Sequence, residues 1–507
     1  MTNKLLFLNA SSGTILYFLT VVITFLLTPV VVNNLGKFDY GLWEMLVSIV
    51  GYMGILDLGI GPALLRNVAI SHGQGDYKQL QKVFSTSLVF FCSLSLFSSF
   101  LYFCLYLYPD LIFESVQDDI SRLQIVIGMF AVNTFIVFPM NVYIGTLFGL
   151  QQHIYVNCTR AMLLVFNGIF TYVLLTTEYA DGLMIMASLQ FFSNVTQFIV
   201  YTYLIKKNHL MILVSLKFFS FNVLRDLFMY GLKSSILMIS SRLQFATMPF
   251  VIAKAASVDS IIYYSIPCRL IDYARGFSLA VGFPLTPHFT SLIGKDNREA
   301  LIHTWFQSAL FLQIITGSMI FILYYCGDLF LQLWIGKEIL LSGNSIVMAL
   351  LLGFLFQAFT PNSMQMLLAS SRHGKVAFVY LIFALLSIPL AYYLVYYFGI
   401  VGAAYSNSII TAIVSVVTLW SACSFLETSF FSYIKKTIFP LLIPLFVLAF
   451  SLWLFKYFIS PSSYISLIFN ILFGLFIYSL TIWNFVFSRD IRDSIKSFVV
   501  NSFLKFT

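Results

Sequence analysis

Three charged residues recur within one apolar stretch of the sequence, residues 260–286. Arg269, Asp272 and Arg275 are spaced every third residue, so at 3.6 residues per turn they share one broad face of a helix. Asp272 can pair with either arginine but cannot neutralise both, so the face keeps a net positive charge. Because a guanidinium stays charged when buried and forms paired hydrogen bonds to phosphate or carboxylate oxygens, this face is suited to binding an anion.

Arg242 adds a further cation from the preceding apolar stretch, 227–252. It lies ten residues from the end of its stretch, and Arg269 lies nine residues from the start of the next, so two antiparallel helices would hold them at similar depth. We therefore predict a cationic patch of Arg242, Arg269 and Arg275, supported by Asp272. The alternative is that Asp272 pairs with Arg242 or Arg269 and only holds helices together.

Asp57 stands among helix-breaking residues in the stretch 51–69. Four glycines and Pro62 weaken this stretch as a helix. A bend with a carboxylate beside it predicts a hinge with a proton or cation site, and hence a coupling or gating role for Asp57. The alternative is a salt bridge to a cation on a neighbouring helix. Arg66 could be the gating partner only if the glycines unwind the segment, since nine residues of straight helix span about 13 Å.

Gln190, Asn194 and Gln197 follow i, i+4, i+7 spacing and share one helix face. Amides within a membrane helix either join neighbouring helices by hydrogen bonds or bind sugar hydroxyls, and both interpretations remain open. No His/Asp or paired-carboxylate arrangement stands out in the loops, nor does a phosphate-cradling glycine loop, and the six cysteines have no paired spacing. We therefore assign no catalytic residue and no metal site.

Membrane-spanning helices must position these side chains. Of the 507 residues, 60% are apolar and 9% charged, and the mean hydropathy of +0.92 excludes a soluble globule. Apolar runs of about 20 residues, long enough to cross a bilayer as helices, recur along the whole chain. We predict fourteen spans, at 12–32, 42–64, 83–108, 123–147, 159–177, 183–205, 227–252, 260–286, 300–325, 342–368, 377–397, 403–423, 437–459 and 464–486.

The distribution of positive charge predicts the orientation of these spans. Most of the 28 lysines and arginines fall in cytoplasmic segments if the amino terminus is cytoplasmic, and the even number of spans returns the carboxyl terminus to the same side. This bias also accounts for the net charge of +8 without a nucleic-acid partner.

A shift of 220 residues brings features of the two halves into register. Pro29 falls on Pro249, Asp39 on Asp259, His153 on His373 and Gly182 on Gly402. Each copy holds six spans, so both enter the membrane in the same direction, as parallel repeats. We therefore predict an all-α integral membrane protein with a six-helix lobe at 1–210, a cytoplasmic linker at 211–226, a second six-helix lobe at 227–425, two appended helices at 437–486 and a cytoplasmic tail at 487–507.

The run LGKFDYGLWEMLVSIVGYMGILDLGIGPALLRNVA, residues 35–69, resembles the amino-terminal signature of Wzx-type polysaccharide-unit flippases. These belong to the multidrug/oligosaccharidyl-lipid/polysaccharide (MOP) exporter superfamily. The matching features are Leu35-Gly36, the turn Tyr40-Gly41-Leu42-Trp43, the motif Asp57-Leu58-Gly59 and Arg66.

The resemblance implies two lobes like those of MATE transporters and lipid II flippases. It also implies that the chain moves an undecaprenyl-pyrophosphate-linked oligosaccharide, an O-antigen or capsule unit, to the periplasmic leaflet of the bacterial inner membrane by alternating access. Arg242, Arg269 and Arg275 would then hold the pyrophosphate or an acidic sugar. No cofactor is expected, and a proton or sodium gradient would drive the cycle. The expected partners are the lipid-linked glycan, membrane lipid, a polysaccharide polymerase and a chain-length regulator.

Two other functions compete with this interpretation. A cation-coupled multidrug exporter of the same superfamily would carry more acidic than basic residues in its spans, whereas here the bases outnumber the acids. A membrane polysaccharide polymerase or acyltransferase would be an enzyme, and polymerases usually have a long external loop that this sequence lacks. We therefore expect a transporter rather than an enzyme.

Overall fold

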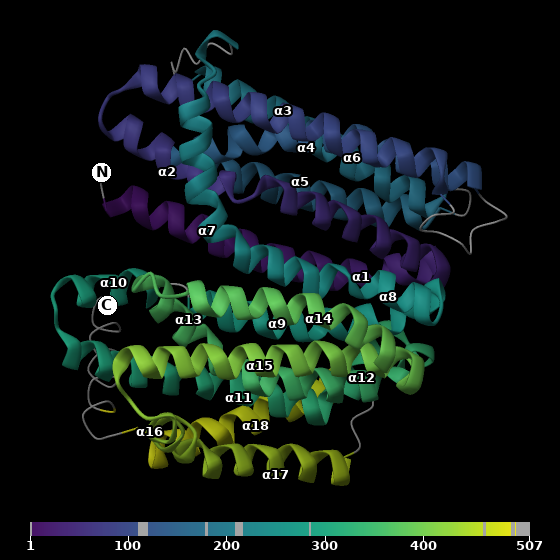
Figure 1. Ribbon diagram of the computed structural model, residues 1–507. Helices are drawn as coiled ribbons and strands as arrows, with labels where there is room; N and C mark the ends of the chain where they lie inside the picture. Colours follow the sequence, from purple (N-terminus) through teal and green to yellow (C-terminus); the bar gives the residue numbers. More distant parts are fainter. Residues whose placement is uncertain are drawn as a thin grey trace, which may run out of the picture. The chain divides into compact units, whose positions relative to one another are not determined.

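The computed structural model describes residues 3–109, 120–177, 181–207, 216–282, 285–459, 463–487 and 492 (Figure 1). Throughout these ranges the regular structure is helical, because a segment surrounded by lipid must satisfy its backbone hydrogen bonds internally. The predicted tail 487–507 lies almost entirely outside the described residues, as does part of the predicted linker 211–226.

Contacts divide the chain into two compact units, residues 1–262 and 263–507. The first holds α1 (Asn3–Met53), η1 (Gly54–Asp57), α2 (Ile60–Gly73), α3 (Tyr77–Leu107), α4 (Ile120–Gly149), α5 (His153–Leu175), α6 (Gly182–Lys207), η3 (Leu216–Phe218), α7 (Phe221–Ala246), α8 (Met248–Ala255) and η4 (Val258–Ser260). The second holds nearly all of α9 (Ile261–Gly282), then α10 (Leu285–Gly294), α11 (Arg298–Ile335), α12 (Lys337–Gln357), α13 (Thr360–Ala369), α14 (Gly374–Phe398), α15 (Val401–Leu426), α16 (Phe430–Thr437), η5 (Phe439–Leu441), α17 (Leu442–Ile459) and α18 (Tyr464–Phe485).

Eleven stretches of the described chain are long and apolar enough to cross a bilayer, and a bent pair, Ser345–Gln357 with Thr360–Ala369, would make a twelfth. The predicted count of fourteen is therefore not confirmed. The predicted span 12–32 and most of the predicted span 42–64 fall within the single stretch Ser12–Asp57. Its 46 residues exceed one bilayer crossing, and its helix is kinked at Gly36. The other missing span is α9, whose three charged side chains make it less apolar than the rest.

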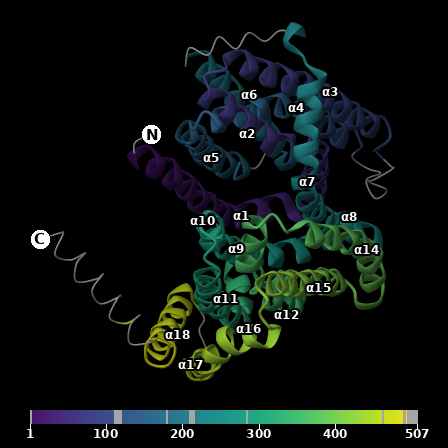
Figure 2. The ribbon, with the colours of Figure 1, turned by 60° about the vertical axis from the view of Figure 1, so that its left-hand side comes forward.

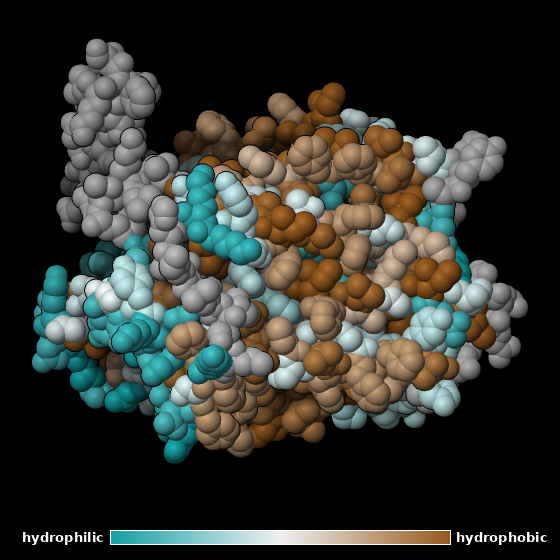
Figure 3. Space-filling model, turned by 90° about the horizontal axis from the view of Figure 1, so that it is seen from above, coloured by the Kyte–Doolittle hydropathy of each residue, from teal (hydrophilic) through white to brown (hydrophobic). Residues whose placement is uncertain are grey.

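The outer surfaces of the long helices are apolar. Phe100 on α3, Phe166 on α5 and Phe446 on α17 are 60%, 57% and 70% exposed. Figure 3 shows one face of the molecule, on which hydrophobic residues cover the middle and hydrophilic residues gather toward the ends. So much exposed apolar surface is the pattern of a protein solvated by lipid.

The two halves use the same turns at matching positions. α4 ends with Gln151 in the left-handed conformation, and the Gln152 amide donates to the Leu147 carbonyl at 2.8 Å. At a shift of 220, α13 ends with left-handed Ser371, and the Arg372 amide donates to the Leu367 carbonyl at 2.9 Å. Asp76 caps α3 as Asn297 caps α11, at a shift of 221. The order of helices and turns therefore repeats, as the sequence shift predicts.

The contact units and the predicted lobes are different divisions of the chain. The repeat assigns α7 and α8 to the second lobe, 227–425, but both helices pack in the first unit, α7 against α1, α2 and α3 and α8 against α1. The predicted lobes describe the two copies of the sequence repeat, and their boundaries remain a prediction.

The two appended helices pack on α11 in the second unit (Figure 2). Lys456 of α17 forms a salt bridge with Asp328 at 2.9 Å. In α18 the Tyr478 hydroxyl donates to the Ile314 carbonyl at 2.9 Å. These polar contacts hold both helices to the same neighbour.

Glycines allow α7 to touch the break between η1 and α2 through backbone atoms. A Cβ built on Gly231 would lie 2.7 Å from the Leu58 carbonyl oxygen, and one built on Gly59 would lie 2.4 Å from the Gly231 oxygen. Gly59 also has a φ of 74°, a conformation that side chains disfavour. Neither glycine can be replaced without moving α7.

We expect Gly231→Ala to lower the free energy of unfolding by about 1 to 3 kcal/mol, because the added methyl group must displace backbone. Thermal unfolding of the detergent-solubilised protein measures this. Gly128→Ala in α4 is the matched control, since its Cβ would meet nothing within 4 Å. Equal stability of the two variants would contradict the contact.

Candidate functional site

The segment around Asp57 is broken into two helices. α1 ends at Met53, η1 continues to Asp57, and Leu58 and Gly59 take left-handed φ values of 50° and 74° before α2 begins. The predicted span 42–64 is therefore interrupted at the bend predicted beside Asp57. The glycines that weaken the helix in the sequence do interrupt it.

Asp57 compensates for this break. Its carboxylate accepts hydrogen bonds from the backbone amides of Gly61, at 3.0 Å, and of Ile60, at the start of α2. These amides have no helical partner, and a negative charge at a helix amino terminus is favourable. Arg66 does not pair with the Asp57 carboxylate, although the segment between them is unwound. Its guanidinium carbon lies instead 4.8 Å from the centre of the Tyr230 ring.

Arg242 lies on α7 in the first unit, and its guanidinium lies beside Gly51 of α1. Its helix is tied to α1 one turn further on, where the hydroxyls of Tyr52 and Thr247 share a hydrogen bond. Arg242 itself is exposed. This cation therefore lies close to the α1 end that precedes the break.

The other predicted charges lie on α9 in the second unit. Arg275 forms a salt bridge with Asp272 at 3.1 Å, one turn away on the same helix. The Asp272 side chain is 55% exposed and that of Arg275 only 14%. Since Arg242 belongs to the first unit, the joint patch of Arg242, Arg269 and Arg275 stays a prediction.

The predicted amides line a hollow of mixed polar and apolar character between α5 and α6 in the first unit. It encloses about 320 Å³. Its lining residues are Trp43, Arg160, Leu163, Leu164, Asn167, Thr171, Met186, Leu189, Gln190, Ser193, Asn194 and Gln197. One cation, three amides that the sequence analysis singled out, one further amide and two hydroxyls thus surround one space, with an indole ring beside them.

Two of the three predicted amides also join side chains within the protein. Asn194 donates to the Asn133 amide oxygen of α4 at 2.8 Å, which is an interhelical contact. Gln197 accepts from the Tyr201 hydroxyl of its own helix at 3.3 Å. The interhelical and the cavity interpretations of this helix face therefore both describe part of the structure.

Sequence reasoning missed Arg160 as a residue of this hollow. The predicted span 159–177 placed it at a helix end, but α5 begins at His153, so Arg160 lies about two turns into the helix.

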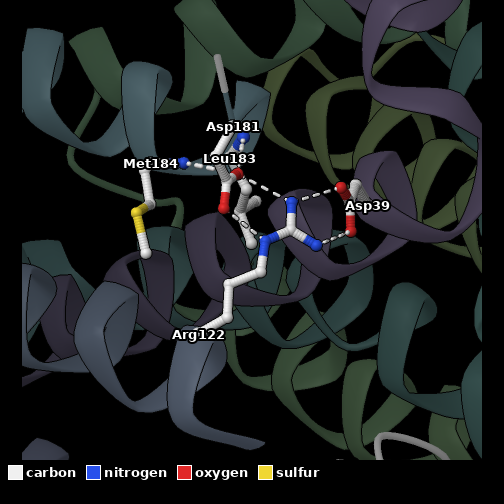
Figure 4. Close-up of polar contacts among 5 residues, drawn as sticks. All are labelled: Asp39, Arg122, Asp181, Leu183 and Met184. Atoms are coloured by element: carbon white, nitrogen blue, oxygen red, sulfur yellow. Dashed lines mark hydrogen bonds and ion pairs between the residues drawn. The ribbon is translucent and has the colours of Figure 1, made fainter. Parts of the chain in front are cut away.

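A second missed feature is the ion cluster of Asp39, Arg122 and Asp181, which joins α1, α4 and the start of α6 (Figure 4). Arg122 donates from Nη1 and Nη2 to Asp39 at 3.1 and 2.6 Å, and from Nη2 to Asp181 at 2.7 Å, with a further bond from Nε. Asp181 also accepts from the amides of Leu183 and Met184 at 3.0 and 3.2 Å. The three charges are too far apart in sequence for spacing to reveal them.

The pKa of Asp181 reflects these contacts. Burial alone would raise it, but the hydrogen bonds from Arg122 and the two backbone amides outweigh burial and hold the pKa of this carboxyl below its ordinary value. Asp181 therefore contributes stability as a carboxylate.

The chain is similar to known proteins in both sequence and fold. The family described as "Polysaccharide biosynthesis protein" matches residues 6–271, more than half of the chain. The chain belongs to this family. A protein of Shigella flexneri named "Putative O-antigen transporter" is 23% identical over 395 residues, covering 76% of this chain and 90% of that protein.

Solved structures show the fold of this polysaccharide biosynthesis family member. Lipid II flippase MurJ in an inward closed conformation superposes with a TM-score of 0.69 at 14% identity, covering 94% of this chain and 98% of that one. An inward-facing multidrug resistance MATE family transporter of the MOP superfamily superposes with a TM-score of 0.64 at 18% identity, covering 83% and 96%. The predicted MATE and lipid II flippase-like fold is confirmed. These relatives are named as transporters or flippases, not as enzymes.

We expect Asp57→Ala to lower the free energy of unfolding by about 0.5 to 2 kcal/mol, because the α2 amides lose their acceptor. Asp57→Asn should retain most of the stability, since an amide oxygen accepts the same bonds. Thermal unfolding in detergent compares the two variants. Equal losses would show that the negative charge, not the acceptor, is what the break requires.

The lowered pKa of Asp181 predicts a pH-dependent contribution to stability. Because the folded-state value lies below the unfolded-state value of about 3.9, the stabilisation is present above that pH and is lost as the pH falls through the folded pKa. Asp181→Asn should thus be less stable than wild type by about 1 to 3 kcal/mol at pH 7, and the difference should shrink below about pH 4.

Unfolding temperatures of wild type and Asp181→Asn between pH 7 and pH 3 test this expectation. Glu427→Gln is the control, because the Glu427 side chain is 75% exposed and its salt bridge to Arg298 should contribute little. A difference for Asp181→Asn that stayed constant with pH would refute the charged role.

Proposed function

We propose that this protein flips an undecaprenyl-pyrophosphate-linked oligosaccharide from the cytoplasmic to the periplasmic leaflet of the bacterial inner membrane by alternating access, with both termini cytoplasmic. The observation that carries the proposal is the hollow between α5 and α6. Besides apolar residues, an arginine, four amides and two hydroxyls line it, all on membrane helices. Polar groups within a membrane need partners, and a polar ligand would supply them here. Membership of a polysaccharide biosynthesis family and similarity to a protein named as an O-antigen transporter support a glycan as that ligand.

The chemistry of the hollow suits a sugar. Amides such as Gln190 and Asn167 both donate and accept, as sugar hydroxyls require. Trp43 borders the hollow with a largely buried ring, 9% exposed, whose apolar edge can contact the sugar. Arg160 would bind an acidic substituent or a phosphate oxygen. In this proposal Arg242, Arg269 and Arg275 hold the pyrophosphate.

The proposed energy source is a proton or sodium gradient acting through Asp57. The carboxylate sits at the break between η1 and α2, where α7 also touches the backbone. Binding of a cation there would weaken the hydrogen bonds to the α2 amides and so favour a different bend. Arg66, on α2, would follow the movement.

A multidrug exporter that carries organic cations is the main competing function. The arginine in the hollow argues against it, because a fixed guanidinium repels a cationic drug. The fold alone does not separate the two functions, since MATE transporters share it.

In the organism that encodes this chain, deletion of its gene should abolish surface glycan and cause lipid-linked units to accumulate. Restoring the gene with Gln190→Leu or Arg269→Ala should fail to restore normal glycan. Each lost hydrogen bond to substrate should cost about five- to tenfold in transport, more for the arginine. Glycan staining and mass spectrometry of extracted lipid-linked units are the measurements.

Thr196→Ala is the matched control on α6, because Thr196 is exposed outside the hollow and its hydroxyl bonds only to the Phe192 carbonyl of its own helix. It should restore glycan fully. Normal surface glycan in the deletion strain would refute the function. Normal glycan with Gln190→Leu would refute the sugar site.

A further inference from the structure

A second hollow, of about 440 Å³, lies in the second unit where α14 begins and α15 ends. Arg372 and Lys375 line it together with the hydroxyls of Ser421 and Ser424 and the ring of Trp420. Its described lining contains two cations and no acidic side chain. It therefore attracts a negatively charged group.

An adjoining hollow differs in charge. It encloses about 360 Å³ and shares Arg372, but it also contains Asp296 and the salt bridge between Arg298 and Glu427 at 2.9 Å. Its cations are thus matched by acids. The two hollows together have three cations, Arg298, Arg372 and Lys375, and two acids, so one positive charge is in excess, and Lys375 places it in the hollow between α14 and α15.

The backbone holds Arg372 in position before any ligand binds. Ser371 takes a left-handed φ of 56°, and the Arg372 amide donates to the Leu367 carbonyl, which closes the end of α13. The guanidinium carbon lies 4.9 Å from the centre of the Phe425 ring. Because its backbone is fixed by the turn and its guanidinium packs on a ring, Arg372 loses little conformational entropy when an anion binds.

The hollow opens at the level of the membrane surface. Gly374–Phe398 and Val401–Leu426 are consecutive candidate spans, so the start of one and the end of the next lie at the same boundary. Trp420 is 63% exposed within two turns of the end of its span, the position favoured by interfacial tryptophans. Phe378, one turn beyond Lys375, is 60% exposed toward the apolar side.

The first half of the repeat shows that the turn does not need these side chains. At a shift of 220 residues, Arg372, Lys375 and Trp420 correspond to Gln152, Tyr155 and Val200. The turn at Gln152 has the corresponding hydrogen bond, and the residue before it, Gln151, is also left-handed. The cations and the indole are therefore additions to one copy of a shared backbone motif.

We propose that the hollow between α14 and α15 binds the phosphodiester headgroup of an anionic phospholipid. Arg372 and Lys375 contact the phosphate, Ser421 and Ser424 donate hydroxyl hydrogens to its oxygens or to the glycerol, and Trp420 packs beside the upper acyl chain. Basic pockets between membrane helices are suited to such headgroups. The bound lipid tethers the α14–α15 end to one leaflet.

Native mass spectrometry of the purified full-length protein in detergent tests the proposal. Phosphatidylglycerol should bind more tightly than phosphatidylcholine. The double variant Arg372→Gln/Lys375→Gln should bind phosphatidylglycerol about tenfold more weakly, because two contacts with the headgroup charge are lost. Millimolar inorganic phosphate should not displace the lipid, since the acyl chains contribute to binding.

Lys206→Gln/Lys207→Gln is the matched control, because it removes the same charge at the end of α6, the counterpart of α15. It should bind phosphatidylglycerol as wild type does. Trp420→Leu, which leaves both cations, should weaken binding of phosphatidylglycerol and phosphatidylcholine alike, and it remains informative if the double variant unfolds. Equal binding of the two lipids by wild type, an unaffected double variant, an unaffected Trp420→Leu, or displacement by inorganic phosphate would each overturn the proposal. None of these readouts uses a glycan, so they do not depend on the transport function.

Discussion

Polar groups on helices that lipid surrounds must find partners within the protein, and this constraint explains most of the structure. A charged side chain within the bilayer costs about 2.5 to 3.5 kcal/mol on insertion scales unless it is paired or solvated. Arg122 meets the constraint with two carboxylates from other helices, and Asp57 meets it with the free amides of α2. Arg160 meets it differently, by lining a hollow with amides and hydroxyls. The first arrangement holds helices together, the second caps the start of α2, and the third leaves room for a ligand.

The break at Asp57 interrupts the helix, but its exposed backbone amides are hydrogen-bonded. Two left-handed residues interrupt the helix, yet the carboxylate satisfies the amides that the break exposes, and α7 contacts it through Gly231. A backbone contact of this kind contains no side chain that could adjust to a shift. A displacement at the break would therefore displace α7 as well.

The two copies of the repeat share backbone geometry but differ in their side chains. The turn after α4 and the turn after α13 keep the same hydrogen bond, 220 residues apart, while the side chains on them differ. The charges of α9 show the same division, since Arg269 and Arg275 correspond to uncharged Ile49 and Ile55. The two halves thus share the geometry of these helix ends and differ in the side chains placed on them.

Sequence alone determined the membrane class, the helical architecture, the repeat and the family resemblance, because these depend on composition, on local periodicity and on residues close together in the chain. It also identified the helix face of Gln190, Asn194 and Gln197, which 3.6-residue spacing dictates. The number of spans that the sequence predicts, fourteen, is not confirmed. The difference lies in α1, which is one kinked helix, and in α9, which carries three charges. Tertiary structure alone decided the partners of Arg122, the place of Arg160 in a hollow, and the choice of Asp57 for backbone amides over Arg66. These depend on contacts between residues far apart in the chain, whose geometry is set by how whole helices pack and not by the spacing of neighbours.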